Sequence, residues 1–450
     1  MSELPKGWVE DKVGKYIHLR NGYAFKSHDY VEPSKNTVPV IRISDIDGEW
    51  ASDKKANHVA VDKAISGFEV VKNDLLVAMS GATTGKIGIY NGNEPALQNQ
   101  RVGNFKLNAP EICNSSFRNY LVKYISPTLL EIAYGGAQPN ISASAIEELV
   151  VSFPPLAEQK RIVEKLDEVL AHVDSIKARL DSIPNTLKRF RQSVLASAVS
   201  GKLTEEWREK HAFSWKESCI GSIALVATGK TPKRTEPSYW DTPDVPWLTS
   251  SATGILFCNE AEQYVSQFAV DDCKLKMFGK GTLLLAMYGE GKTRGQVTEL
   301  TFEATCNQAC AAITVNQELA LISFVKLRLL ENYEETRKSA AGGNQPNLNL
   351  NKVREIPVNL PSLEEQTEIV RLVDQYFAFA DAIEKQVNNA QQRVDKLTQS
   401  ILAKAFRGEL VPQDPNDEPA DKLLERIAKA KQDADALVKA AKKSVKKGGL

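Results

Sequence analysis

Residues 154–194 read PPLAEQKRIVEKLDEVLAHVDSIKARLDSIPNTLKRFRQSV, and this stretch decides the fold of the chain. From Ile162 to Val194, apolar side chains recur at alternating spacings of four and three residues, which is the heptad pattern of a coiled-coil helix. Residues 361–401 repeat the pattern in the same register. The predicted seam consists of Ile162, Leu166, Val169, Val173, Ile176 and Leu180 in the first helix, and Ile369, Val373, Tyr376, Ile383, Val387 and Val394 in the second.

The two helices belong to a longer internal repeat with a shift of 207 residues, the separation between Trp8 and Trp215. Upstream of the helices the two copies agree only at scattered positions, some of them at a shift of 208. A repeat of this length predicts a duplicated structural unit. Further matching pairs are Glu158-Gln159 with Glu365-Gln366, Asn99-Gln100 with Asn307-Gln308, and Gln138-Pro139-Asn140 with Gln345-Pro346-Asn347.

The segment ahead of each helix contains short β-branched runs separated by Gly, Asn, Asp and Pro, which favours a strand-rich domain. We therefore predict an α+β fold: two strand-rich domains joined by two long helices that form an antiparallel coiled coil, related by a pseudo-two-fold internal repeat. The alternative is two independent amphipathic helices, each packed on its own globular domain. The predicted boundaries are 1–153 and 212–360 for the domains, 154–211 and 361–412 for the helix regions, and 413–450 for a C-terminal helix and basic tail.

Composition excludes several classes of protein. The chain has 450 residues, with 57 Lys and Arg balanced by 57 Asp and Glu, and 42% hydrophobic residues. A uniformly basic nucleic-acid coat or a cationic membrane binder would shift this balance. The first twenty residues include Glu10, Asp11 and Lys12 instead of an apolar signal core, and no run reaches the roughly 18 apolar residues of a membrane span. We expect a cytoplasmic protein.

Several short motifs resemble catalytic, nucleotide-binding or metal-binding sites only in part. Residues 286–293, AMYGEGKT, match a relaxed phosphate-binding loop, but the residues that follow predict a strand where such a loop opens a helix. A P-loop-type nucleotide-binding protein built around Lys292 remains the alternative function. Glu158-Gln159-Lys160 resembles part of a nuclease site, although a structural helix entry explains it better. Cys306 and Cys310 could share a helix face, yet buried thiols are favoured over a metal site, so we predict neither catalytic nor metal-binding residues.

Several motifs together resemble the specificity subunits of type I restriction-modification systems, over nearly the whole chain. Each motif is weak by itself, but their order, with much of it doubled at a constant spacing, is specific. The motifs are the openings at Trp8 and Trp215, DLLVAMSG at 74–81, GKIG at 85–88, Asn99-Gln100, GGAQPNI at 135–141, PPLAEQ at 154–159 and SVLASAVSGKL at 193–203.

The resemblance implies two target-recognition domains, each reading one half of an asymmetric split site on double-stranded DNA. The helices would fix the unread gap between the half-sites. It also implies that this chain is not catalytic and holds no cofactor. Two modification subunits would dock on the helices and methylate adenine with S-adenosylmethionine. Restriction subunits would add translocation and cleavage that depend on ATP and Mg²⁺.

Residues for DNA contact are chosen from polar, glycine-rich turns, where backbone can approach phosphates and side chains can reach base edges. The alternative for each residue is a solvated turn side chain. The two Gln-Pro-Asn loops occur in both copies and are interpreted as structural or backbone-contacting. The candidate DNA-binding residues are Thr83, Thr84, Lys86 and Arg101 in the first domain, and Lys292, Thr293, Arg294 and Gln308 in the second.

Length and charge add two expectations. A helix from Ile162 to Val194 spans about 48 Å, against about 34 Å for one turn of B-DNA, so the two domains could face neighbouring grooves.

Residues 1–150 hold 16 basic and 17 acidic residues, and residues 212–356 hold 15 and 16. Because phosphate binding needs local positive charge, we predict that the isolated chain binds DNA weakly and that the assembled complex binds it well.

Overall fold

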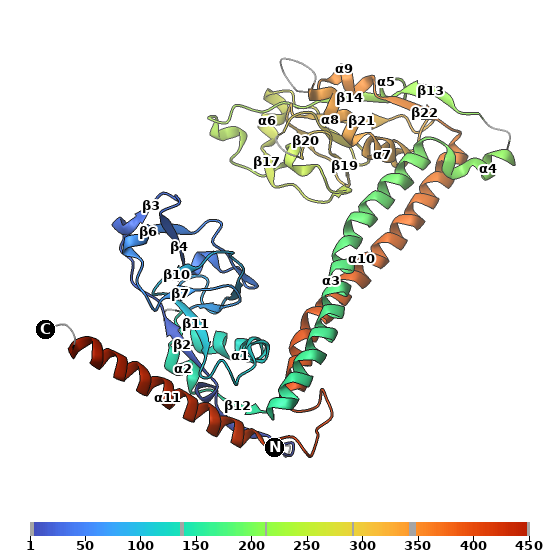
Figure 1. The fold of residues 1–450 in the computed structure, drawn as a ribbon. Helices are drawn as coiled ribbons and strands as arrows, with labels where there is room; N and C mark the ends of the chain where they lie inside the picture. Colours follow the sequence, from blue (N-terminus) through green and yellow to red (C-terminus); the bar gives the residue numbers. More distant parts are fainter. Residues whose placement is uncertain (1–3, 136–138, 212–213, 290–291, 342–347, 448–450) are drawn as a thin grey trace. The chain divides into compact units, whose positions relative to one another are not determined.

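The computed structural model describes residues 4–135, 139–211, 214–289, 292–341 and 348–447. The chain divides into two compact units (Figure 1). Unit 1 combines residues 1–178 with 391–450, and unit 2 consists of residues 179–390. Each unit therefore contains one strand-rich domain together with parts of both long helices.

Unit 1 is built on two five-stranded sheets and one short strand pair. The first sheet has the order β2 (Ile17–Asn21), β11 (Val102–Leu107), β8 (Leu75–Ala78), β9 (Ile87–Tyr90), β5 (Trp50–Ala51). The second has the order β3 (Tyr30–Val31), β6 (Asn57–Ala60), β4 (Thr37–Ile41), β10 (Ala96–Gln98), β7 (Glu69–Val70). The unit also contains the pair β1 (Val9–Lys12) with β12 (Val150–Phe153), and the helices α1 (Ser115–Tyr134) and α2 (Ala143–Glu147).

Unit 2 repeats the topology of the first sheet strand for strand, which confirms the internal repeat. This sheet has the order β14 (Ala224–Thr228), β21 (Cys310–Val315), β18 (Leu283–Ala286), β19 (Val297–Leu300), β16 (Phe257–Cys258). The smaller sheets are β17 (Gln263–Val265), β15 (Val245–Leu248), β20 (Thr305–Cys306), and the pair β13 (Lys216–Cys219) with β22 (Pro357–Leu360). The short helices are α4 (Glu205–Glu209), α5 (Ile220–Ile223), α6 (Gln267–Asp272), α7 (Ile322–Glu331), α8 (Tyr333–Ala341) and α9 (Leu350–Arg354).

The two long helices, α3 (Leu156–Val199) and α10 (Leu363–Phe406), each have 44 residues and lie side by side (Figure 1). In unit 1, Nζ of Lys177 lies 2.8 Å from a carboxylate oxygen of Asp395. In unit 2, the guanidinium of Arg191 lies 2.6 Å from Asp381. The later residue of α3 thus pairs with the earlier residue of α10, so the helices run antiparallel and the alternative of two independent helices is wrong.

The ends of the seam also form the cores of the domains. Ile162 and Leu166 are buried in the core of unit 1, and Ile369 and Val373 are buried in the core of unit 2. Val173 and Val387 are also buried, while Val169, Leu180, Ile383 and Val394 are half-buried. Ile176 and Tyr376 are 46% and 40% exposed, more than a seam position predicts. Val387 is buried although it belongs to neither domain core, so burial along the seam does not depend on the domains alone.

A tryptophan and a glutamate fasten each domain to the start of its helix. The indole Nε1 of Trp8 donates to Oε2 of Glu158 at 2.9 Å, and Nε1 of Trp215 donates to Oε1 of Glu365 at 3.0 Å. The next residue of each helix, Gln159 or Gln366, is fully buried. The interpretation of Glu158-Gln159 as a structural helix entry is therefore confirmed.

The C-terminal helix α11 (Ala420–Lys447) begins within unit 1. Its first turns pack into the core of that unit through Ala420, Leu423, Leu424 and Ile427. No helix in the described part of the chain is long and apolar enough to span a membrane.

Candidate nucleic-acid interface

In unit 1, several loops meet at one end of the first sheet's strands, where β8 ends and β11 begins. Because β8 and β11 are antiparallel, with Ala78 opposite Val102, the turn after β8 lies beside the turn before β11. The backbone N–H of Met79 donates to the carbonyl of Arg101 at 2.9 Å, and the N–H of Gln100 donates to Tyr23 at 2.8 Å. We call this set of loops, residues 22–23, 42–44, 79–86 and 99–101, loop edge 1.

Unit 2 has the same arrangement. The N–H of Met287 donates to the carbonyl of Ala309 at 2.8 Å, and the N–H of Asn307 donates to Leu248 at 2.8 Å. The hydroxyl of Thr231 donates to Oε1 of Gln308 at 2.6 Å. We call residues 229–231, 249–253, 287–289, 292–296 and 307–309 loop edge 2.

One glycine in each loop edge permits a close backbone approach. A Cβ on Gly22 would lie 2.1 Å from the carbonyl oxygen of Asn99, and one on Gly229 would lie 1.6 Å from the carbonyl oxygen of Cys306. Neither position can take a side chain without moving backbone. The two glycines are 207 residues apart and hold matching loops together.

Loop edge 1 contains all four candidates of the first domain. Lys86 and Arg101 are exposed, and within the described residues no hydrogen bond or ion pair involves their charged groups. Thr83 is half-buried and donates to the carbonyl of Ile43 at 3.2 Å. Thr84 is only 2% exposed and donates to Gly81 at 2.6 Å. The hydroxyl of Thr84 closes the turn, and DNA contact by this residue stays a prediction.

Loop edge 2 contains the other four candidates. Lys292 and Gln308 are exposed, and Thr293 is half-buried. Arg294 is also half-buried, and its guanidinium donates to the carbonyl of Gly289 at 3.4 Å while its Nε is buried without a partner. Lys292 and Gln308 are therefore the two side chains of this set that are well exposed at the edge.

Sequence reasoning missed other residues that the fold brings to or near these loops. In loop edge 1, Tyr23 is partly exposed and packs edge-on against Phe25, with ring centroids 5.0 Å apart. In loop edge 2, Lys230 is exposed, and nearby Arg234 lies over the ring of Trp240 at 4.0 Å. Tyr23 and Lys230 each follow one of the repeated glycines. The glycine pair was the signal that could have found them.

The Gln-Pro-Asn loop of the first copy contacts residues 79–86 of loop edge 1. Asn140 forms an antiparallel bridge with Ser80, and the carbonyl of Pro139 accepts from Thr84 at 3.4 Å. These contacts are consistent with a structural role for this loop. Gln138 and the whole of Gln345-Pro346-Asn347 lie outside the described residues.

The nucleotide-binding alternative fails on local structure. The motif at 286–293 leads from β18 to β19, which pair antiparallel with Leu285 opposite Val297. A phosphate-binding loop requires a helix at this point, so the alternative built around Lys292 is wrong. Cys306 and Cys310 are buried free thiols, and no group of potential metal ligands occurs among the described residues.

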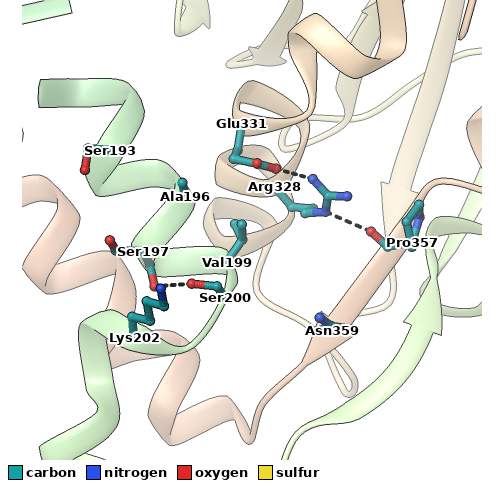
Figure 2. Close-up of a pocket in the computed structure, with 10 residues that line it drawn as sticks. All are labelled: Ser193, Ala196, Ser197, Val199, Ser200, Lys202, Arg328, Glu331, Pro357 and Asn359. Carbon is teal, nitrogen blue, oxygen red and sulfur yellow. Dashed lines mark hydrogen bonds and ion pairs between the residues drawn. The ribbon is translucent and has the colours of Figure 1, made fainter. Parts of the chain in front are cut away.

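Unit 2 also has a hollow of about 600 Å³ beside the end of α3, shown in Figure 2. Arg328 lies on its wall, where it forms an ion pair with Glu331 and donates to the carbonyl of Pro357 at 2.8 Å. In unit 1, the positions that correspond to Val199 and Glu331 are Phe406 and Tyr124. Their rings stack with centroids 4.5 Å apart, so aromatic side chains fill the corresponding place. The lining residues are Ser193, Ala196, Ser197, Val199, Ser200, Lys202, Arg328, Glu331, Pro357 and Asn359.

Comparison with known proteins gives a consistent result. The family model described as the type I restriction modification DNA specificity domain matches residues 5–185 and again 214–391. The chain is 33% identical to the EcoBI type I restriction enzyme specificity subunit of Escherichia coli, over 97% of this chain and 94% of that protein. It is 31% identical to the EcoKI specificity subunit of Escherichia coli strain K12, over 98% and 99% of the two chains.

Two solved structures share the fold. One comes from work on complex assembly and conformational transition of the type I R-M system, with a TM-score of 0.63, 17% identity, and coverage of 91% of this chain and 100% of that one. The other is the HsdS subunit from Thermoanaerobacter tengcongensis, with a TM-score of 0.55, 17% identity, and coverage of 90% and 98%.

Proposed function

This chain belongs to the family of type I restriction enzyme specificity subunits, and from that membership we propose how its two units divide the reading of DNA. The chain is the sequence-specific, non-catalytic DNA-recognition subunit of a restriction-modification complex. Each strand-rich domain reads one half of a split, asymmetric site on double-stranded DNA. One observation supports this division most: the two loop edges share their backbone arrangement but present different side chains at matching positions, Lys86 and Arg101 against Gln296 and Ala309.

The chain works with modification and restriction subunits of the same system. We propose that two modification subunits bind, because the long helices repeat at a constant shift and can offer similar surfaces twice. On this proposal, S-adenosylmethionine, ATP and Mg²⁺ are bound by those subunits, and this chain holds none of them.

The direct test is co-expression with the modification subunits of the same system. We expect adenine methylation at one split motif, which methylation-aware sequencing of the host DNA would identify. A matched culture lacking only this chain is the control. The absence of any new methylated motif in the complete culture would refute the proposal.

A second measurement tests how the complex binds DNA. The domains have no excess of basic residues, so we expect weak, strongly salt-dependent binding by the isolated chain and much tighter binding by the complex. Fluorescence anisotropy with one duplex, at several salt concentrations, compares the two directly. Equal affinity of the isolated chain and the complex would show that this chain alone provides the DNA-binding affinity.

The length of the helices is proposed to set the unread gap between the half-sites. We would insert one heptad between Ser175 and Ala178 of α3 and a matching heptad beside Asp395 of α10, because Lys177 and Asp395 pair across the two helices. Seven residues add about 10 Å, or roughly three base pairs. We expect the gap in the methylated motif to lengthen, or methylation to cease, with both half-site sequences unchanged. A change of half-site bases would contradict the proposal.

A further inference from the structure

The turn that leads into β11 has a defined backbone. The N–H of Asn99 donates to Ile41 at 3.1 Å, and the carbonyl of Arg101 accepts from Met79 at 2.9 Å. The side-chain Oδ1 of Asn99 accepts from the N–H of Arg101 at 3.3 Å. Gln100 occupies the middle of this turn. Among the residues that the structure describes, none forms a hydrogen bond with its side chain that would hold the turn together.

The turn that leads into β21 is built in the same way. The N–H of Asn307 donates to Leu248 at 2.8 Å, and the carbonyl of Ala309 accepts from Met287 at 2.8 Å. Oδ1 of Asn307 accepts from the N–H of Ala309 at 3.0 Å. Gln308 occupies the middle of the turn, as Gln100 does in unit 1.

The two glutamines share features that their neighbours do not. Both are exposed at a loop edge, and both follow an asparagine that shapes the turn. The next residue differs, being Arg101 in unit 1 and Ala309 in unit 2. Since the turn needs only the asparagine and the backbone, the repeated glutamine is available for contact with something outside the chain.

The side chain of Gln308 is held in place by a second residue. Thr231 donates its hydroxyl proton to Oε1 at 2.6 Å, which leaves the amide N–H groups of Gln308 and the other lone pair of Oε1 available. A glutamine with one donor and one acceptor available matches the edge of adenine in the major groove, where N7 accepts and N6 donates.

Building on the proposed function, we propose that Gln100 and Gln308 each read the adenine of one A·T pair, one pair in each half-site. The two half-sites then share an A·T pair, although the rest of their sequences differ. Arg101, whose counterpart in unit 2 is Ala309, distinguishes the first half-site from the second beside this common pair. Thr231 is a positioning residue that orients the amide of Gln308.

The test uses the complete complex of this chain with its modification subunits. Binding is selected from duplexes with randomised half-sites, and the methylated motif is read by sequencing in parallel. For Gln308→Ala we expect preference for one A·T pair in the second half-site to fall about tenfold to a hundredfold. The first half-site should be unchanged. Gln100→Ala should give the mirror result.

Two further variants separate base reading from a structural or backbone role. Gln308→Glu has nearly the same shape but only accepts hydrogen bonds, so preference at that pair should shift toward cytosine, whose N4 donates. Thr231→Val should reduce discrimination at the same pair, while Thr231→Ser should retain it.

Two results would overturn the inference. One is an unchanged preference at every position in all the glutamine variants. The other is an equal loss of affinity for every duplex, which would assign the glutamines to the DNA backbone. If the unmodified complex selects no sequence at all, the proposed function itself fails, so the two failures can be distinguished.

Discussion

The junctions at Glu158 and Glu365 hold matching tryptophans but differ in charge. Oε1 of Glu365 accepts from Trp215, from the hydroxyl of Thr204 at 2.7 Å and from Nε of Arg208 at 3.0 Å. Glu158 accepts from Trp8 on one oxygen and, at 3.4 Å, from the amide of Gln413 on the other, and no cation in the described part of the chain is hydrogen-bonded to it.

The comparison shows which part of the repeat diverged. Tryptophan and glutamate occur in both copies, whereas the segment that follows the opposite helix supplies different partners. Thr204 and Arg208 correspond to Val411 and Pro415. Unit 2 therefore compensates a buried carboxylate with a guanidinium, and unit 1 does so with neutral donors. The glutamate at the start of the helix is the same in both copies, whereas the side chains that donate hydrogen bonds to it differ.

The largest expected effect is on the stability of unit 2 when the charged junction at Glu365 is removed. Glu365→Ala would leave Arg208, Thr204 and the indole of Trp215 without their shared acceptor. Breaking a buried charge pair costs about 3–5 kcal/mol. We therefore expect the free energy of unfolding of unit 2 to fall by that amount, measured by hydrogen exchange along a urea series.

Glu158→Ala is the matched control for this prediction. It removes acceptors from neutral donors, for which about 1–3 kcal/mol is expected in unit 1. Equal losses in the two units would contradict the view that charge separates the junctions.

The second expected effect concerns the hollow of unit 2 and the aromatic pair that fills the same place in unit 1. Phe406→Val gives unit 1 the residue that unit 2 has at Val199, and it removes the stack on Tyr124. Loss of a buried ring and the space left behind should destabilise unit 1 by about 1–3 kcal/mol. Thermal unfolding of the full chain, with hydrogen exchange to locate the change, provides the measurement.

The reverse variant, Val199→Phe, completes this comparison. Val199 lines the hollow, so a larger side chain can enter it without displacing packed neighbours (Figure 2). We expect a change between no effect and a gain of about 1 kcal/mol. A loss as large as that of Phe406→Val would mean that the hollow is not available to a ring.

Local patterns made the helices and the repeat predictable. The seam from Ile162 to Val194 depends on spacing within one segment, so it is visible in the sequence. The sheet order was not predictable, because β8 pairs with β11 as well as with its neighbour β9. Pairing across more than twenty residues leaves no local signal. Ile176 is 46% exposed while Val173, the preceding seam position, is buried, so heptad spacing alone does not predict burial.

The candidate interface was predicted at the level of loops better than of residues. Turns rich in glycine and polar residues do meet at the ends of the inner strands in each five-stranded sheet that the two units share. The burial of Thr84 was not predictable, because a threonine that closes a turn and one that faces solvent look alike in sequence. Tyr23 and Lys230 were missed because they reach the edges only through the close approach of Gly22 and Gly229.

The smallest expected effect tests the neutral junction by pH. Burial raises the pKa of Glu158 above its ordinary value of 4.5, and the hydrogen bonds from Trp8 and Gln413 only partly oppose this. Between the ordinary and the raised pKa, the folded state binds more protons than the unfolded state, so the contribution of Glu158 to stability decreases as pH rises through that range. Other carboxylates titrate in the same range, so the informative quantity is the difference in unfolding free energy between the unmodified chain and Glu158→Gln. This difference should move in favour of the unmodified chain as pH is lowered from 7 toward 4.5. A difference that does not change with pH would show that the hydrogen bonds from Trp8 and Gln413, together with the charge of Arg161, compensate the carboxylate fully.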